Sequence, residues 1–202
     1  MKKRFFALFL ACIMVLAALI LPASLAMAEE EAAFAPTDSK ILVACFSATG
    51  NTWPLAQAAA EYLNADLFRI QPETPYTPED LDYNNDECRA NQEMSDETCR
   101  PTLAETVPNM EQYDVVILAF PIWWGQAPRI VETFVEAHDF SGKTVLPFCT
   151  SGGSGFGSTG EKLAALTGED VIWLEGARFS ADTGAEELAE WFREMGIAPY
   201  QK

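Results

Sequence analysis

A hydroxyl-rich turn at residues 47–52 has the residue types and the position to bind an anion. An apolar run at 41–46 precedes it and predicts a buried strand, and residues 53–63, rich in helix formers, predict a helix after it. Between the two, free backbone N–H groups and the positive end of the helix dipole would face a phosphate. The turn has neither the lysine of a P-loop nor the G-x-G-x-x-G of a dinucleotide site, so a phosphate monoester fits it better than ATP or NAD. The alternative is an ordinary helix start capped by serine or threonine. The six residues of the turn are Ser47, Ala48, Thr49, Gly50, Asn51 and Thr52.

Two later loops, 121–128 and 151–157, also follow apolar runs that predict buried strands. The first loop contains two consecutive tryptophans, which cannot both point into the core. We expect one of them to pack beneath the following helix and the other to stack on a flat apolar ring. The second loop is rich in glycine, so backbone N–H groups can approach a ligand closely; the alternative is a flexible turn. The ligand-contacting candidates are Pro121, Ile122, Trp123, Trp124, Gly125, Thr150, Ser151, Gly152, Gly153 and Phe156.

The rest of the chain alternates strands and helices, which predicts a parallel sheet with helices on both faces. Such sheets bind ligands outside the carboxyl ends of their strands, and all three loops leave such ends. An irregular, proline-containing segment at 71–112, with room for a helix or two, interrupts the alternation. The predicted strands are 41–46, 66–70, 115–120, 144–149 and 171–175, and the predicted helices are 53–63, 128–138, 158–167 and 184–195.

The three loops together resemble the flavin loops of the flavodoxins, and in particular a short-chain, exported branch of that family. The resemblance rests on SATGNT, PIWWGQAP and FCTSGGSG, each after an apolar strand, and it covers roughly residues 40–195. It implies a doubly wound α/β fold with a five-stranded parallel sheet in the order 2-1-3-4-5. It also implies flavin mononucleotide (FMN) as cofactor, with its phosphate on residues 47–52. Trp124 would be the flavin neighbour, and Gly125 would permit a peptide flip that lets a carbonyl accept a hydrogen bond from the reduced ring.

Two departures from the family pattern bear on activity. Gln126 stands where flavodoxins often carry an acid, so one negative charge near the flavin is missing. The glycine-rich loop offers only Phe156 to cover the second flavin face, and if Phe156 points away, that face is open to a substrate. We therefore expect an FMN-binding electron carrier without catalytic residues. One alternative is an FMN-dependent oxidoreductase that reduces a quinone or similar small acceptor, and a second is a flavin-free binding domain of the same fold.

The N-terminus predicts export from the cytoplasm. Residues 1–4 are basic after the initiator methionine, 5–21 are almost entirely apolar, and Ala26-Met27-Ala28 matches a signal peptidase site. We expect a signal peptide at 1–28, a linker at 29–39 and the flavodoxin-like domain at 40–202; the alternative is a retained membrane anchor. Removal of residues 1–28 would change the formal net charge from −17 to −20. Such a surface disfavours nucleic acid and anionic membranes, and it suits docking on basic patches of redox partner proteins.

Four cysteines remain after cleavage. Cys45 and Cys149 fall within apolar strands and are expected to be buried and reduced. Cys88 and Cys99 lie in a polar segment of an exported chain, which favours a disulfide between them over free thiols. The only histidine, His138, is expected to end a helix in solvent, and a metal site is not expected.

Overall fold

The structure, a computed structural model, describes residues 38–201. The predicted signal peptide and most of the predicted linker lie outside the described residues.

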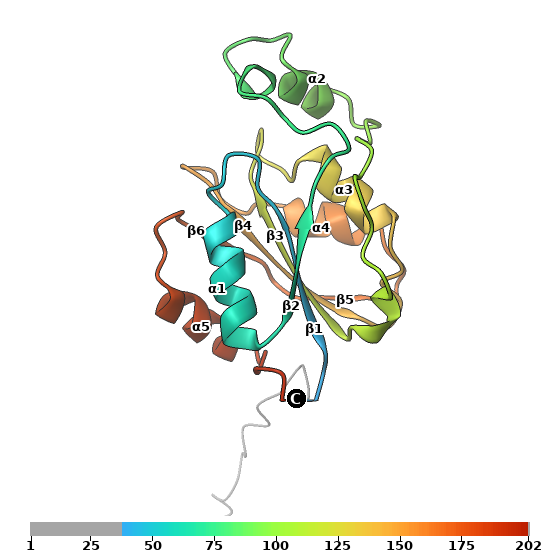
Figure 1. Cartoon of the computed structure of the whole chain (residues 1–202), viewed down its shortest axis with the longest axis vertical. Coiled ribbons are helices and arrows are strands. Elements are labelled where there is room, and N and C mark those ends of the chain that lie inside the picture. The colour runs from blue at the N-terminus through green and yellow to red at the C-terminus, as the bar shows by residue number, and fades with distance from the viewer. Residues whose placement is uncertain (1–37, 202) are drawn as a thin grey trace, which may run out of the picture. The chain divides into compact units, whose positions relative to one another are not determined.

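The sheet is parallel, with the strand order β2-β1-β3-β4-β5 that the sequence predicts (Figure 1). The fifth position differs from the prediction, because the strand expected at 171–175 is shortened to residues 172–173 and a sixth strand that was not predicted follows at 177–179. β5 pairs with the start of β4 at Thr144 and Val145, whereas β6 pairs with its end at residues 148–150. The strands are β1 (Ile41–Phe46), β2 (Asp66–Ile70), β3 (Val115–Pro121), β4 (Thr144–Thr150), β5 (Ile172–Trp173) and β6 (Ala177–Phe179).

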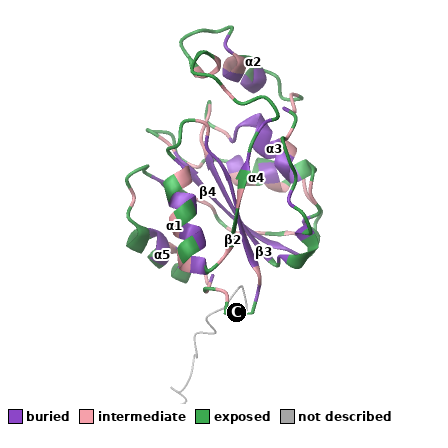
Figure 2. Cartoon of the chain, viewed as in Figure 1, coloured by how far each residue is buried: buried purple, intermediate pink, exposed green. Residues whose placement is uncertain are grey.

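Helices cover both faces of the sheet. Alternate β1 residues face opposite ways, so Val43 packs with α1 and α5, and Ala44 packs with α3 and α4. The three central strands are therefore buried on both sides, which explains their continuous apolar sequences (Figure 2). The helices are α1 (Trp53–Leu63), α3 (Arg129–Glu136), α4 (Thr159–Ala164) and α5 (Ala185–Glu194), each within a few residues of its predicted bounds.

The segment between β2 and β3 extends beyond the carboxyl ends of the strands (Figure 1). It contains the 3₁₀ turns η1 (Glu79–Leu81) and η2 (Met110–Gln112) and the helix α2 (Arg89–Ser95). An antiparallel bridge between Pro72 and Leu103 draws its two sides together. The Arg129 guanidinium on α3 donates to the Met94 carbonyl at 3.1 Å. This bond joins α2 to α3. The segment between β2 and β3 is therefore anchored at the carboxyl edge of the sheet, where ligands are expected.

The predictions for the four cysteines agree with the structure only for the two that lie in strands. Cys45 and Cys149 are buried and free, and burial raises the pKa of each thiol to about 12. The predicted Cys88–Cys99 disulfide is wrong, because both thiols are free. Cys88 is buried at the N-terminus of α2, where its sulfur accepts a hydrogen bond from the Asn91 N–H at 3.4 Å. Cys99 lies beyond the other end of that helix, so the thiols belong to opposite ends of one element.

His138 is half-buried rather than solvated at a helix end. Its Nε2 accepts the Val107 N–H at 2.8 Å, and its Nδ1 lies 2.7 Å from the Phe134 carbonyl oxygen. Burial lowers the pKa of this imidazole. Residues 38–201 contain no cluster of three or more His, Cys, Asp or Glu side chains arranged to hold a metal ion. None of the helices in this range has the length and apolarity needed to cross a membrane.

Candidate functional site

The loop at 47–52 connects β1 to α1, and its three hydroxyl groups have partners in the protein. The exposed Thr49 hydroxyl accepts a hydrogen bond from the Asn51 side-chain amide at 3.3 Å. Ser47 Oγ accepts hydrogen bonds from the N–H groups of Thr52 (3.2 Å) and Trp53 (3.3 Å), so it satisfies the first donors of the helix. The Thr52 hydroxyl lies 2.8 Å from that of Thr150, and both residues are buried. Thr52 therefore links the carboxyl ends of β1 and β4. Its side chain makes no capping bond to α1, unlike the ordinary capped start that the sequence left open.

The outer half of the same loop is free for a ligand. Thr49, Gly50 and Asn51 are exposed, and within residues 38–201 their backbone N–H groups donate to no other group. Gly50 has a φ of +87°, a conformation that favours glycine. The first turn of α1 carries no acidic residue, so the helix dipole there is not neutralised by the chain itself. We call these groups, at Thr49, Gly50 and Asn51, the candidate anion-binding nest.

The loop after β3 forms a tight turn that presents Trp124. Trp123 and Gln126 exchange two backbone hydrogen bonds, at 2.9 and 3.0 Å. The central residues Trp124 and Gly125 have φ values of +47° and +78°, as in a type I′ turn. Positive φ at a residue other than glycine costs about 1–3 kcal/mol and occurs preferentially at functional sites. Trp124 is 51% exposed, so its ring is accessible, and its stacking on a flavin stays a prediction.

Trp123 packs inward, although not beneath the following helix as predicted. Its ring makes edge contacts with Phe46 and Tyr76, at centroid distances of 5.5 and 5.4 Å. Tyr76 is itself held by the long segment after β2. Its hydroxyl bonds the Glu93 carboxylate at 2.5 Å, and Arg89 both bonds Glu93 (2.6 Å) and lies over the Tyr76 ring. Burial, together with this hydrogen bond, raises the pKa of Tyr76. Sequence analysis missed this support because Tyr76 and Trp123 are far apart along the chain.

The glycine-rich loop after β4 is open on its outer side. A Cβ added at Gly152, Gly153 or Gly155 would meet no atom within 4 Å. Phe156 points inward: its ring centroid lies 6.3 Å from that of Phe120, and it fills the space beside Gly176. The side chain named as a cover for the second flavin face is therefore half-buried and packs against the core.

Two cations that sequence analysis missed reach the second and third loops. Arg178 of β6 donates to the Ser151 carbonyl oxygen at 2.7 Å. Lys162 of α4 donates to the Gln126 side-chain oxygen at 2.9 Å. The β3 and β4 loops are also joined, since the Ile122 N–H donates to the Thr150 carbonyl at 2.9 Å. The predicted site residues thus gather at one edge, with Ser47, Thr52 and Phe156 turned inward.

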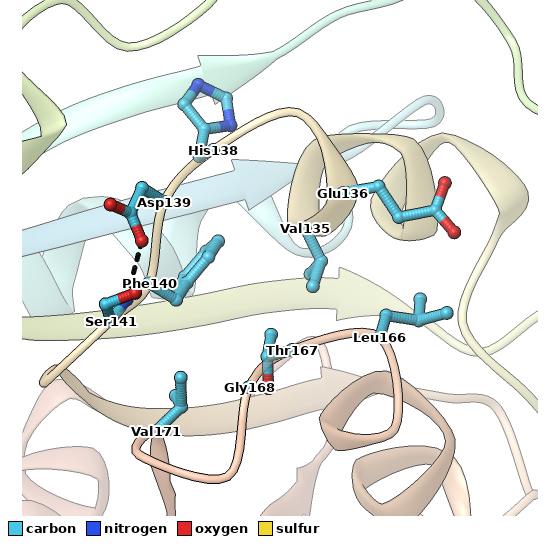
Figure 3. A pocket seen from close by; sticks show the side chains of 10 residues that line it. All are labelled: Val135, Glu136, His138, Asp139, Phe140, Ser141, Leu166, Thr167, Gly168 and Val171. Carbon is cyan, nitrogen blue, oxygen red and sulfur yellow. Dashed lines mark hydrogen bonds between the residues drawn. The ribbon is translucent and has the colours of Figure 1, made fainter.

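A separate hollow of about 140 Å³ lies at the opposite edge, between the α3–β4 and α4–β5 connections (Figure 3). Its polar groups are already bonded. Asp139 accepts the Ser141 N–H at 2.9 Å, and Thr167 both donates to Ala164 and accepts from Trp173. This hollow is remote from the three loops and offers no unsatisfied donor set of its own.

Comparison with known proteins decides the family. The family model described as Flavodoxin matches residues 40–195, the range over which the sequence motifs resemble it. The chain belongs to the flavodoxin family. A search of curated proteins finds no match.

Solved structures agree with the assignment of this chain to the flavodoxin family. A candidate flavoprotein of Bacteroides eggerthii DSM 20697 is 42% identical, with a TM-score of 0.74, and the match covers 79% of this chain and 99% of that one. A second, from Bacteroides uniformis ATCC 8492, is 39% identical, with a TM-score of 0.73 and coverage of 77% and 98%. A flavoprotein of Lactobacillus acidophilus NCFM in complex with FMN shares the fold at 18% identity, with a TM-score of 0.54 and coverage of 69% and 93%.

Proposed function

We propose that this flavodoxin binds FMN and transfers electrons outside the cytoplasmic membrane. The observation that carries the proposal is the nest at Thr49, Gly50 and Asn51. Its N–H groups have no partner in the described chain, and it opens at the same edge as the exposed Trp124. An anion site beside an apolar aromatic surface matches the two ends of FMN, a phosphate and a flat ring.

The residues present fit this cofactor chemically. The backbone of residues 49–51, with the Thr49 hydroxyl and the Asn51 amide, would hold the phosphate. Trp124 and the backbone of Gly152 and Gly153 would contact the ring. FMN supplies the redox chemistry when bound, since its ring accepts and releases electrons. The protein orients that ring and limits the access of water to it, and Gly125 leaves the neighbouring peptide free to turn.

A ligand titration tests the cofactor assignment. Purified apoprotein should be folded without flavin, and its thermal midpoint should rise when FMN is added. Bound ligand stabilises the native state by about 2.7 kcal/mol at a hundredfold excess over Kd. Riboflavin, which lacks the phosphate, should shift the midpoint less. A midpoint that neither flavin moves would instead favour a flavin-free binding domain.

The second candidate is an FMN-dependent oxidoreductase that reduces a quinone or similar small acceptor. The inward packing of Phe156 favours it, because the glycine-rich loop then leaves the second face of a bound ring accessible. Steady-state turnover with NAD(P)H and a soluble quinone separates the two functions. Fast turnover supports the oxidoreductase. Slow turnover with rapid electron exchange to a basic redox protein supports the carrier, whose acidic surface would dock there.

Export is the remaining part of the proposal, and it rests on the basic, apolar and Ala26-Met27-Ala28 pattern of the N-terminus. Terminal sequencing of protein recovered outside the cytoplasm should begin at Glu29. Recovery of the full-length chain from the membrane fraction would favour the retained anchor.

A further inference from the structure

Four of the nine cations in residues 38–201 form no ion pair with a carboxylate. The chain has a formal net charge of −17. In residues 38–201, the cations that pair with Asp or Glu are Lys40, Arg89, Arg100, Arg129 and Arg193. Those with no ion pair in the same range are Arg69, Lys143, Lys162 and Arg178. Lys143 is buried and donates to the Tyr113 carbonyl at 2.7 Å, so its ammonium group has a structural role and does not face a ligand.

The other three cations are exposed, and each contacts one of the three candidate flavin loops or the residue that follows it. Arg69 lies over the ring of Trp53, the first residue of α1 after the 47–52 loop, 4.9 Å from its centroid. Lys162 bonds Gln126, and Arg178 bonds the Ser151 carbonyl. All three partners are neutral, so each cation keeps its charge. We call Arg69, Lys162 and Arg178 the carboxyl-edge cations.

Two of the carboxyl-edge cations contact residues that are next to the nest loop or joined to it. Arg69 reaches it from β2 through Trp53. Arg178 reaches it from β6, because Ser151 follows Thr150, whose hydroxyl bonds Thr52 at the end of the nest loop. Because β2 and β6 lie on opposite sides of β1 in the strand order, the two arginines come from opposite sides of the nest loop, and the N-terminus of α1 follows that loop. Apart from Lys162 beside Gln126, the other cations of residues 38–201 are paired with carboxylates or buried.

This arrangement answers a physical difficulty of the proposed function. A strongly negative protein repels a dianionic ligand, and backbone dipoles act only over the last few ångströms. Full charges attract over the screening distance, about 8 Å at physiological salt. We infer that the carboxyl-edge cations, chiefly Arg69 and Arg178, draw the FMN phosphate to the nest and speed its capture. This inference rests on the proposed binding of FMN.

Stopped-flow fluorescence with the purified protein tests the inference. The double variant R69Q/R178Q should bind FMN at least about threefold more slowly than wild type at low ionic strength, since focused charge changes association rates by 10-fold or more. The difference should disappear at about 1 M salt, where the screening length is only about 3 Å. Riboflavin, which has no phosphate charge, should associate at the same rate in both proteins. The R69K/R178K variant should recover most of the FMN rate, because it keeps the charges and loses the arginine geometry.

A matched control removes the same charge elsewhere. Lys40 precedes β1 at the opposite edge and Arg193 lies on α5, and both are in ion pairs. K40Q/R193Q should slow FMN association much less than R69Q/R178Q. Equal slowing in the two double variants would overturn the inference while leaving FMN binding intact. Failure of wild-type protein to bind FMN or riboflavin would overturn the proposed function itself, and the inference with it.

Discussion

Substitution of Gly176 by alanine tests whether Phe156 is locked into the core. A Cβ at this position would lie 2.3 Å from Phe156 Cζ and 2.6 Å from its Cε1. Carbon atoms in contact normally stay about 3.5–4.0 Å apart. Gly176 does not have a positive φ, so its backbone accepts alanine and only the ring obstructs it. The substitution therefore forces either the Phe156 ring or the β5–β6 connection to move.

The cost follows from the size of this overlap. Overpacking a well-filled site by a methyl group costs about 1–3 kcal/mol. In a domain of this size, each kcal/mol lowers the thermal midpoint by roughly 2–4 °C. If the ring swings outward, it also enters the space outside the glycine-rich loop, where it would cover a bound flavin. Quinone turnover, if the protein has it, should then fall together with stability.

Thermal and urea unfolding of G176A, F156A and the double variant measure this coupling. G176A should destabilise the wild-type protein but have little effect in the F156A background, where no ring remains to clash. G153A is the control, because a Cβ at Gly153 meets no atom within 4 Å. If G176A proves as mild as G153A, or equally costly with and without Phe156, the inward packing of this ring is refuted.

Three further predictions address the site and the core. Thr49→Ala should weaken FMN binding at least about tenfold, since a hydrogen bond to a charged group contributes about 1.5–3 kcal/mol, and should leave riboflavin affinity unchanged; equal losses would argue against a phosphate at the nest. Thr52→Val should cost about 1–3 kcal/mol of unfolding free energy by leaving the buried Thr150 hydroxyl unpaired, and T52V/T150V should recover much of that loss in a denaturant titration. Burial lowers the pKa of His138 in the folded state, so below about pH 6.5 the unfolded chain binds more protons and stability should fall as the pH drops towards the folded pKa. His138→Gln, which keeps an acceptor for the Val107 N–H but cannot titrate, should flatten this dependence in unfolding measurements between about pH 7.5 and 5.5.

The fold could be predicted because its signals are local. The strand at 41–46 and the helix at 53–63 agree with β1 and α1 to the residue, since a continuous apolar run and a block of helix formers each mark one element. The strand order followed from the family resemblance. Prediction was poorest at 171–175, where a glycine packed against Phe156 falls between β5 and β6.

The site could be predicted as a set of loops but not as a set of side-chain directions. Loops at the carboxyl ends of neighbouring parallel strands must lie together, so the sequence was enough to gather them at one edge. It could not show that the Thr52 hydroxyl would be taken up by Thr150, because that contact joins residues 98 positions apart. For the same reason, the support of Trp123 by Tyr76 was not foreseen. The proposed Cys88–Cys99 bond failed because composition shows which thiols are available and not which ends of a helix they occupy.

By itself, then, the sequence determined the order of strands and helices, the family, and the edge of the sheet that carries the candidate site. Periodicity and short motifs suffice for these, because each is written within a few consecutive residues. Only the tertiary structure decided which groups at that edge are free. It turned Phe156 and Thr52 inward, left the nest and Trp124 open, and brought Arg69 and Arg178 to either side. These outcomes depend on packing between distant segments, where burial and hydrogen bonding select one orientation for each side chain.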